Sequence, residues 1–235
     1  MIWRISSLLL ALIAGPVAAV ECRNAEVSDA SYSICDVDVA SDQLRLFLND
    51  ETGRPFGGFG ALPGQVTFAM NAGMFHANRS PVGYHVEQGK TLKTLSTRAG
   101  PGNFGMLPNG VFCFDSDTAS VMETLAFAKA ELDCEFATQS GPMLVIDGQL
   151  HPRFFATSDS RNIRNGVGIS RDGATLHFVI SNQAVNFYDF ASVFRDYLNV
   201  NNALYFDGRI SRLYSPQLNR NDYGVTLGPI IAVVD

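Results

Sequence analysis

Short segments with alternating apolar residues run through most of this chain, and they constrain its fold more than any other feature. Alternation with a period of two, bounded by Gly, Pro, Asn or Asp, is typical of β-strands with one buried face. Segments of this kind, or short apolar runs of strand length, predict strands over 33–39, 44–48, 66–70, 110–114, 120–123, 143–146, 166–170, 175–181, 203–206 and 230–234.

The turns between these segments predict which strands pair. Arg171-Asp172-Gly173 separates 166–170 from 175–181, which is a hairpin signal. Asp147-Gly148 predicts a turn directly after 143–146. We also expect 33–39 to pair with 44–48, in which Leu44, Leu46 and Leu48 share one face.

Helical periodicity is confined to two segments. Residues 124–132 are rich in Ala, Leu and Glu, and 187–198 places apolar residues at helical spacing. Asn186 is the predicted N-cap of the second helix, with Asp189 three residues on. Because strands outnumber helices and hairpins recur, the predicted fold class is α+β, with a mixed, largely antiparallel sheet core and a few packed helices.

Residues 1–19 have the three parts of a secretory signal peptide. Arg4 gives a positive start, Leu8-Leu9-Leu10 lies in the apolar part, and Val17-Ala18-Ala19 offers small residues for cleavage. The alternative is a short membrane anchor, but the apolar stretch is shorter than the about 20 residues that span a bilayer. A periplasmic or secreted protein is predicted, with a single domain over 20–235.

The net charge of the mature chain indicates which classes of partner are disfavoured. Cleavage after Ala19 would leave 216 residues (235 − 19) with 16 Lys and Arg, since Arg4 is lost, against 23 Asp and Glu, a charge of −7. Such an acidic surface argues against nucleic acid. After 1–19 no apolar run is long enough for stable membrane insertion.

The cysteines are expected to form disulfides, because their number is even and the predicted compartment is oxidising. Of the three connectivities, Cys22–Cys35 and Cys113–Cys134 are favoured because each closes a short local loop. A zinc site is disfavoured because no two cysteines have C-x-x-C spacing. No metal site is predicted from cysteine or histidine spacing.

Five polar segments follow or interrupt the predicted strands: 70–76, 100–105, 137–145, 161–166 and 203–211. Taken alone, each fits an ordinary turn or loop about as well as a ligand site. An Asp at the end of an apolar strand can serve as a general acid or base, and nearby Arg side chains can bind phosphate. The candidates are Asn71, His76, Gln139, Ser140, Arg161, Arg164, Asn165, Asp207 and Arg209.

The order of these segments carries a resemblance. Asn-Ala-Gly-Met-Phe, Gly-Pro-Gly-Asn-Phe, Gln-Ser-Gly-Pro-Met-Leu-Val, Arg-Asn before Val-Gly-Ile, and Leu-Tyr-Phe-Asp-Gly follow one another along the chain. By this series of motifs the chain resembles the phosphodiester glycosidase family. The family includes the N-acetylglucosamine-1-phosphodiester uncovering enzyme. The similarity is greater to small exported bacterial members, and it covers roughly 66–235.

The resemblance implies a hydrolase that cleaves the glycosidic side of a sugar-1-phosphodiester in a cell-envelope or extracellular glycoconjugate. It implies catalytic roles for Asp207, Arg164 and Asn71. Ser140 as a nucleophile is disfavoured, because its surroundings are not G-x-S-x-G. The predicted substrate-binding residues are Gln139, Ser140, Asn165, Arg161, Arg209 and His76, and of these the family motif carries over Gln139.

One motif departs from the family pattern. Many members continue Asp-Gly with a further Gly and Ser-Ser, whereas here Arg209 replaces a Gly and Arg212 replaces a Ser. Ordinary glycosidases use two carboxylates, and Asp172 and Asp189 are candidates for the second only by their proximity to motifs. The sequence requires no cofactor, although Asp207 would suit a divalent cation.

Two alternatives to a glycosidase stay open. One is a non-catalytic periplasmic protein that binds a glycan or phosphodiester, which the two arginine replacements favour. The other is a phosphodiesterase that cuts the P–O bond on the other side.

Overall fold

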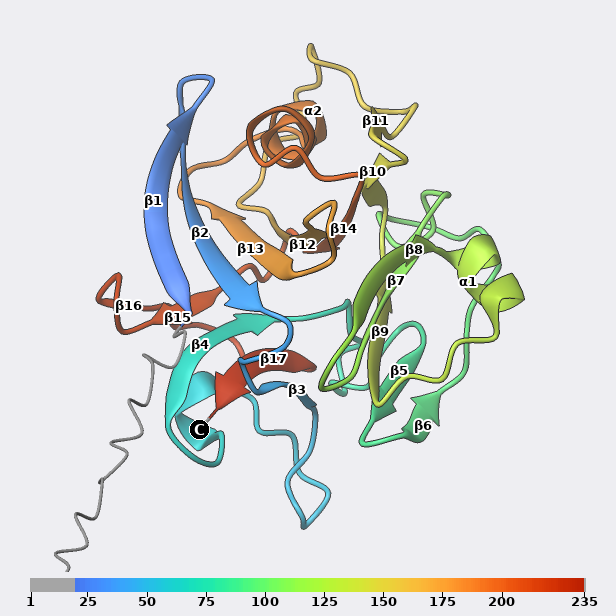
Figure 1. Ribbon diagram of the computed structural model, residues 1–235, viewed down its shortest axis with the longest axis vertical. Helices are drawn as coiled ribbons and strands as arrows, with labels where there is room; N and C mark the ends of the chain where they lie inside the picture. Colours follow the sequence, from blue (N-terminus) through green and yellow to red (C-terminus); the bar gives the residue numbers. More distant parts are fainter. Residues whose placement is uncertain (1–19, 235) are drawn as a thin grey trace, which may run out of the picture.

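Three antiparallel sheets form the molecule (Figure 1). The computed structural model describes residues 20–234, so the predicted signal peptide lies outside the described residues. The first sheet has the order β1 (Glu21–Val27), β2 (Ala30–Asp38), β13 (Thr175–Ser181), β12 (Asn165–Ile169), β14 (Asn202–Asp207), β10 (Met143–Ile146) and β11 (Gln149–Leu150).

The other two sheets lie beside the first one (Figure 1). The second has the order β16 (Arg220–Asn221), β15 (Leu213–Ser215), β4 (Val66–Asn71), β17 (Ile230–Val234) and β3 (Leu44–Phe47). The third has the order β6 (Lys90–Lys93), β5 (His85–Glu87), β9 (Phe136–Ser140), β7 (Gly110–Phe114) and β8 (Ala119–Glu123). The predicted antiparallel, strand-rich fold is confirmed.

Aromatic side chains from all three sheets meet in the main core. Phe178 of the first sheet packs on Phe68 of the second and Phe112 of the third, with ring centroids 4.9 and 6.1 Å apart. All three rings are fully buried. Burial of each such side chain contributes about 1.5–3 kcal/mol, so this cluster joins the sheets into one body.

Helices are short and cover only part of the sheets. Helix α1 spans Thr124–Ala130 and ends where Glu131 adopts a left-handed backbone, two residues before the predicted end. Helix α2 spans Phe187–Ser192, and a π-helical turn continues it over Val193–Tyr197. A third piece is a 3₁₀ turn at Phe59–Ala61.

The predicted N-cap of α2 is confirmed. The side chain of Asn186 accepts a hydrogen bond from the backbone N–H of Asp189 at 2.8 Å. Phe190 and Phe194 of this helical segment are fully buried in a second core, on the face of the first sheet opposite the aromatic cluster. This packing explains the helical spacing of the apolar residues in 187–198.

One predicted pairing is wrong. Strand β2 does not pair with β3; it lies between β1 and β13, while β3 pairs with β17 in another sheet. The prediction also missed strand β1, which forms a hairpin with β2 through Ser28 and Asp29. Both turn residues have positive φ, the conformation that a tight two-residue hairpin needs. The 166–181 hairpin and the Asp147-Gly148 turn are present as predicted.

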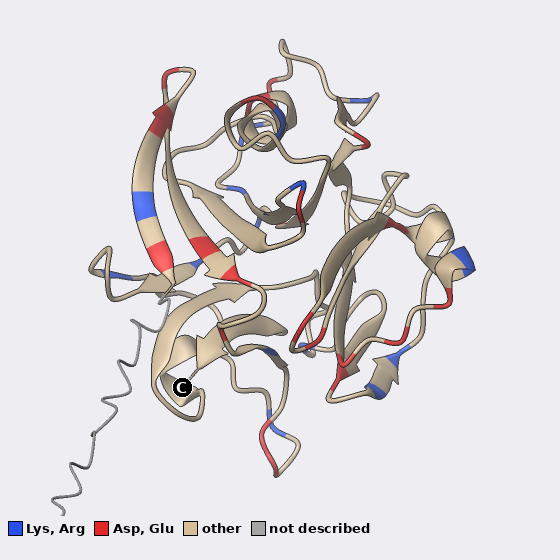
Figure 2. Cartoon of the chain, viewed as in Figure 1, with Lys and Arg blue, Asp and Glu red and all other residues tan. Residues whose placement is uncertain are grey.

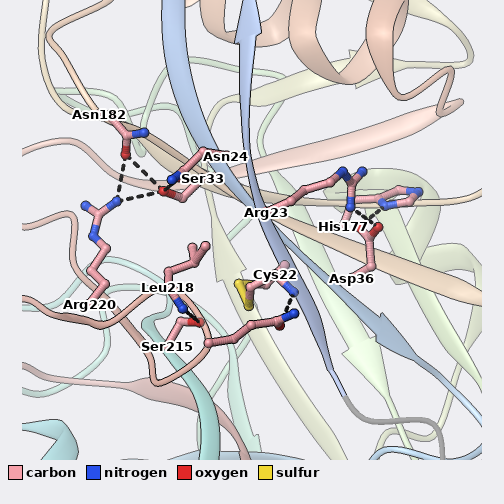
Figure 3. Close-up of a disulfide and its surroundings, with 12 residues drawn as sticks. Cys22, Arg23, Asn24, Ser33, Asp36, His177, Asn182, Ser215, Leu218 and Arg220 are labelled. Carbon is pink, nitrogen blue, oxygen red and sulfur yellow. Dashed lines mark hydrogen bonds and ion pairs between the residues drawn. A yellow bond between two sulfur atoms is a disulfide. The ribbon is translucent and has the colours of Figure 1, made fainter.

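Both predicted disulfides are present. Cys22 and Cys35 are directly opposite each other in the β1–β2 hairpin, and Cys113 of β7 is joined to Cys134 ahead of β9. Figure 3 shows the first of them, with Asp36 between Arg23 and His177 on the neighbouring strands. Disulfides persist in oxidising compartments, so they agree with a location outside the cytoplasm.

Charged residues are scattered over the sheets and loops, as Figure 2 shows. Among the helices of residues 20–234, none combines the length and apolar character that crossing a membrane requires.

Candidate active site

Two asparagines join the first and second sheets at the ends of their strands. Asn165 begins β12 and Asn71 ends β4. The side-chain amide of Asn165 donates to the backbone oxygen of Asn71 at 2.9 Å and to its Oδ1 at 3.1 Å. Both residues are fully buried, and such a polar pair holds its position because every alternative leaves buried groups unpaired.

This pair supports the loop that carries Asp207. Asn165 Oδ1 accepts from the backbone N–H of Asp207 at 3.1 Å and from the hydroxyl of Ser211 at 3.2 Å. The same hydroxyl is 2.6 Å from the backbone oxygen of Asp207. The loop from 207 to 211 is therefore closed on itself and fixed to β12.

Asp207 lines an open hollow of about 660 Å³. Its walls come from four of the five polar segments identified in the sequence and from the turn after His76. Side chains that line it include Met74, Phe75, His76, Arg79, Asn103, Phe104, Asn162, Asp207, Arg209 and Ile210. Aromatic and apolar groups with a few charged ones are typical of a small-molecule site.

The electrostatics of Asp207 suit acid–base chemistry. Burial raises the pKa of its carboxyl, and backbone N–H groups of the following loop oppose that rise. One of them, from Arg209, donates to Oδ1 at 2.8 Å. A carboxyl that faces a hollow with a raised pKa is a candidate general base or acid.

Arg164 lies beneath the hollow and does not line it. Its guanidinium is fully buried and stacks on the ring of Phe187, 3.6 Å from the centroid. It donates to the backbone oxygens of Val185 at 2.9 Å and Ser160 at 2.8 Å, and to the hydroxyl of Tyr205 at 3.3 Å. Burial lowers the pKa of Arg164, and no carboxylate in residues 20–234 forms an ion pair with it.

Tyr205 connects this buried charge to the hollow. Its hydroxyl lies beside Gly208, which lines the hollow. Gly208 leaves room for that hydroxyl, because a Cβ at this position would lie 1.8 Å from it. Arg164 was expected to contact phosphate directly, but it does not line the hollow, and its hydrogen bond to the hydroxyl of Tyr205 is its contact in that direction.

The side chain of Gln139, in β9 of the third sheet, forms hydrogen bonds to neighbouring residues of the protein. Its Oε1 accepts from the backbone N–H groups of Tyr84 and Ser96, each at 3.0 Å. Its amide donates to the backbone oxygen of Ser96 at 2.6 Å and to the hydroxyl of Thr124 at 3.1 Å. These contacts leave its oxygen and both its N–H groups occupied, and its side chain does not line the hollow.

The remaining expected residues divide into two groups. Asp207, Arg209 and His76 line the hollow, whereas Asn71, Asn165 and Ser140 are buried below it. Ser140 donates to the backbone oxygen of Phe206 at 2.8 Å, which ties β9 to β14. Arg161 is exposed and faces Asp189 at 3.6 Å.

Neither candidate second carboxylate lines the hollow. Asp172 holds its own hairpin turn by accepting from Ser170 at 2.6 Å and from the backbone of Ala174 at 3.1 Å. Asp189 faces Arg161. Among the described residues, Asp207 is the one carboxylate that lines the hollow.

Sequence reasoning missed Arg79 and Val82 as lining residues. Arg79 has positive φ and lies 5.6 Å from the centroid of the Phe75 ring. The Asn78-Arg79-Ser80-Pro81 turn directly after His76 was the available signal. Within residues 20–234, no three His, Cys, Asp or Glu side chains gather as a metal site would need.

Solved structures share this fold. The catalytic domain of the zebrafish N-acetylglucosamine-1-phosphodiester alpha-N-acetylglucosaminidase, auto-inhibited by its pro-peptide, matches with a TM-score of 0.64 at 15% identity, over 95% of this chain and 85% of that one. A putative exported protein from Burkholderia pseudomallei matches with a TM-score of 0.54 at 12% identity, over 88% and 74% of the two chains.

Sequence comparison gives the family. The uncharacterized protein YigE of Escherichia coli K12 is 36% identical over 215 residues, which cover 88% of this chain and 84% of YigE. Residues 64–225 match the family described as phosphodiester glycosidase. A match over more than half of the chain, together with the shared fold of a glycosidase catalytic domain, shows that this protein belongs to the phosphodiester glycosidase family.

Proposed function

We propose that this protein is an exported hydrolase that cleaves the glycosidic bond of a sugar-1-phosphodiester. The observation that carries the proposal is the placement of Asp207, a partly buried carboxylate with a raised pKa, in a hollow shared with the cationic Arg209. A carboxylate beside a developing cationic sugar, with a positive charge at the leaving phosphate, is the arrangement that this reaction needs.

Phosphate is a good leaving group once its charge is neutralised, so the reaction needs little help from a general acid. Arg209 and Arg79 both line the hollow and supply that neutralisation. Asp207 takes a proton from water, the water oxygen bonds to the anomeric carbon, and the bond from that carbon to the phosphate oxygen breaks. The products are the free sugar and a phosphomonoester of the second alcohol.

The buried polar residues act by positioning. The Asn71–Asn165 pair fixes the backbone of Asp207. Arg164 holds the hydroxyl of Tyr205, which lies beside Gly208 in the wall of the hollow. Side chains held in this way lose little entropy when the transition state forms.

The walls of the hollow suit a sugar. Met74, Phe75 and Phe104 offer apolar surface for the C–H face of a pyranose, and His76 and Asn162 offer polar groups for its hydroxyls. The zebrafish relative is named for N-acetylglucosamine-1-phosphodiester, so N-acetylglucosamine is the first sugar to test. With two disulfides, we infer a periplasmic or secreted location and a substrate in the cell envelope or an extracellular glycoconjugate.

A labelling experiment tests this function. The mature protein is incubated with N-acetylglucosamine 1-(methyl phosphate) in heavy-oxygen water, and the products are analysed by mass spectrometry. Label in the sugar supports a glycosidase, whereas label in methyl phosphate identifies a phosphodiesterase. Binding without product favours a binding protein. This is the second candidate function, because Asp207 is the one carboxylate among the described residues that lines the hollow.

Two variants test whether product formation depends on the carboxylate of Asp207. Asp207→Asn keeps the size and the acceptor oxygen for Arg209 but removes the base, and product formation should fall at least 100-fold. Asp133→Asn, at an exposed position ahead of β9, is the matched control and should retain activity. Full turnover by Asp207→Asn would contradict the proposed mechanism.

A further inference from the structure

A second hollow of about 560 Å³ adjoins the first. The two share Gly208, Arg209 and Ile210, so this segment forms a ridge with Asp207 on one side. The other side is lined by polar groups that include Ser181, Asn182, Ser211, Arg212, Arg220 and Asp222. The proposed reaction uses none of the residues found only in this second hollow.

Arg212 is the unusual residue in the second hollow. It is only 9% exposed, and in residues 20–234 its guanidinium has neither a hydrogen bond nor an ion pair. Its backbone N–H donates to Oδ1 of Asn71 at 2.8 Å, which fixes the residue at this place. The guanidinium lines the open hollow, so its five N–H donors can bind an anion that enters there. Burial also lowers the pKa of Arg212, although the charge of Asp222 opposes this.

The backbone shapes the position of this side chain. Gly224 passes so close that a Cβ there would lie 2.4 Å from Nη2 of Arg212. The guanidinium is therefore held against the chain at Gly224, and its side chain lines the hollow. An Arg held in one orientation binds a carboxylate or phosphate with little further loss of entropy.

Asp222 does not neutralise Arg212. It forms an ion pair with Arg220, with Nη2 and Oδ2 2.8 Å apart, and its Oδ2 also accepts from the backbone of Leu213 at 2.9 Å. Arg220 in turn donates to Ser33 and Asn182, as Figure 3 shows. Because Arg220 and Asp222 neutralise each other, Arg209 and Arg212 leave the second hollow with a net positive charge. This contrasts with the net charge of −6 of the whole chain.

We propose that the second hollow binds an anionic group, a carboxylate or a phosphate, on the alcohol part of the substrate. This inference rests on the proposed function. The sugar lies beside Asp207, the phosphodiester crosses the ridge at Arg209, and the further anion reaches Arg212. The substrates are then sugar phosphodiesters whose second alcohol carries an additional acidic group.

Three matched substrates test this inference. They are N-acetylglucosamine 1-phosphodiesters of 1-propanol, of 3-hydroxypropanoate and of 3-hydroxypropyl phosphate, which differ in the terminal group. We expect kcat/KM to be about tenfold higher or more for the anionic diesters, as one charge-assisted contact would give. In Arg212→Gln the ratio of anionic to neutral kcat/KM should fall to about 1.

Controls separate charge from folding. Arg212→Lys keeps the charge but loses the planar fork, so it should retain a reduced preference. Arg45→Gln removes an exposed arginine on β3 that lines neither hollow, and it should leave the preference as it is. Thermal melting of each variant shows whether it is folded.

Direct binding distinguishes failure of the anion site from failure of the proposed function. Calorimetry with 3-hydroxypropyl phosphate needs no turnover, and its affinity should fall about tenfold in Arg212→Gln. If no diester is cleaved but this binding holds, the proposed function fails and the anion site remains. If the diesters are cleaved with equal kcat/KM, or if binding is independent of Arg212, the anion site is overturned.

Discussion

The amide of Asn165 donates to both oxygens of Asn71, and this pair holds two loops, one that carries Asp207 and one that carries Arg212. Asn165 holds the backbone of Asp207 at 3.1 Å, and Asn71 holds the backbone of Arg212 at 2.8 Å. The two proposed ends of the substrate site, the base and the anion site, are thus set by one hydrogen-bonded unit between two sheets.

Replacing Asn71 with Ala should weaken both stability and activity. The backbone N–H of Arg212 loses its acceptor, and each buried group left unpaired costs about 1–3 kcal/mol. We expect the free energy of unfolding in urea to fall by about 2–4 kcal/mol and kcat to fall more than tenfold. Asn201→Ala, at an exposed position before β14, is the control. A variant as stable as the parent would show that the Asn71–Asn165 pair does not contribute to the free energy of unfolding.

The pH dependence of activity should report the ionisation of Asp207. Only the carboxylate can accept a proton from water, and burial raises its pKa above the ordinary value of about 4. We therefore expect kcat/KM to rise with pH through a pKa higher than that value and then level off. A limb at or below the ordinary value would contradict the assignment.

The same burial predicts that Asp207 lowers stability. A carboxyl with a raised folded-state pKa binds more protons in the folded state, so stability falls as pH rises from the ordinary Asp pKa through the raised one. Asp207→Asn should melt at a higher temperature than the parent at pH 7, by about 2–4 °C for each kcal/mol relieved. The difference should vanish in acid, below the ordinary pKa. A lower melting temperature at pH 7 would contradict this account.

Gln139→Ala separates the expected sugar contact from the observed structural role. The variant leaves the backbone N–H groups of Tyr84 and Ser96 without their acceptor, so we expect a loss of about 2–4 kcal/mol in urea unfolding. The KM for a sugar phosphodiester should change less than threefold. A raised KM with unchanged stability would instead support a direct sugar contact.

Removing either disulfide should destabilise the protein by about 3 kcal/mol, because each closes a loop in the unfolded chain. The sequence separations are 13 for Cys22–Cys35 and 21 for Cys113–Cys134, so the second should contribute slightly more. Paired Cys→Ser variants compared by urea unfolding check this. Equal stability of the parent with and without reductant would contradict it.

The local sequence determined where many strands and turns form. The hairpin of β12 and β13, strand β17 and the N-cap Asn186 agree with the structure, because alternation, turn residues and capping act over only a few residues. Strand β9 escaped recognition as a separate strand, since its Thr138, Gln139 and Ser140 are polar although all are buried.

Tertiary structure decided which strands pair and which polar side chains reach the hollow. Pairing of β2 with β13 spans about 140 residues, and no local pattern encodes it. Likewise, the sequence singled out Asp207, Arg164 and Gln139 alike, but only the packing of three sheets placed Asp207 in the hollow and the other two beneath or beside it. A side chain's chemistry is fixed by its residue type, whereas its exposure and charge environment depend on neighbours that arrive from distant parts of the chain.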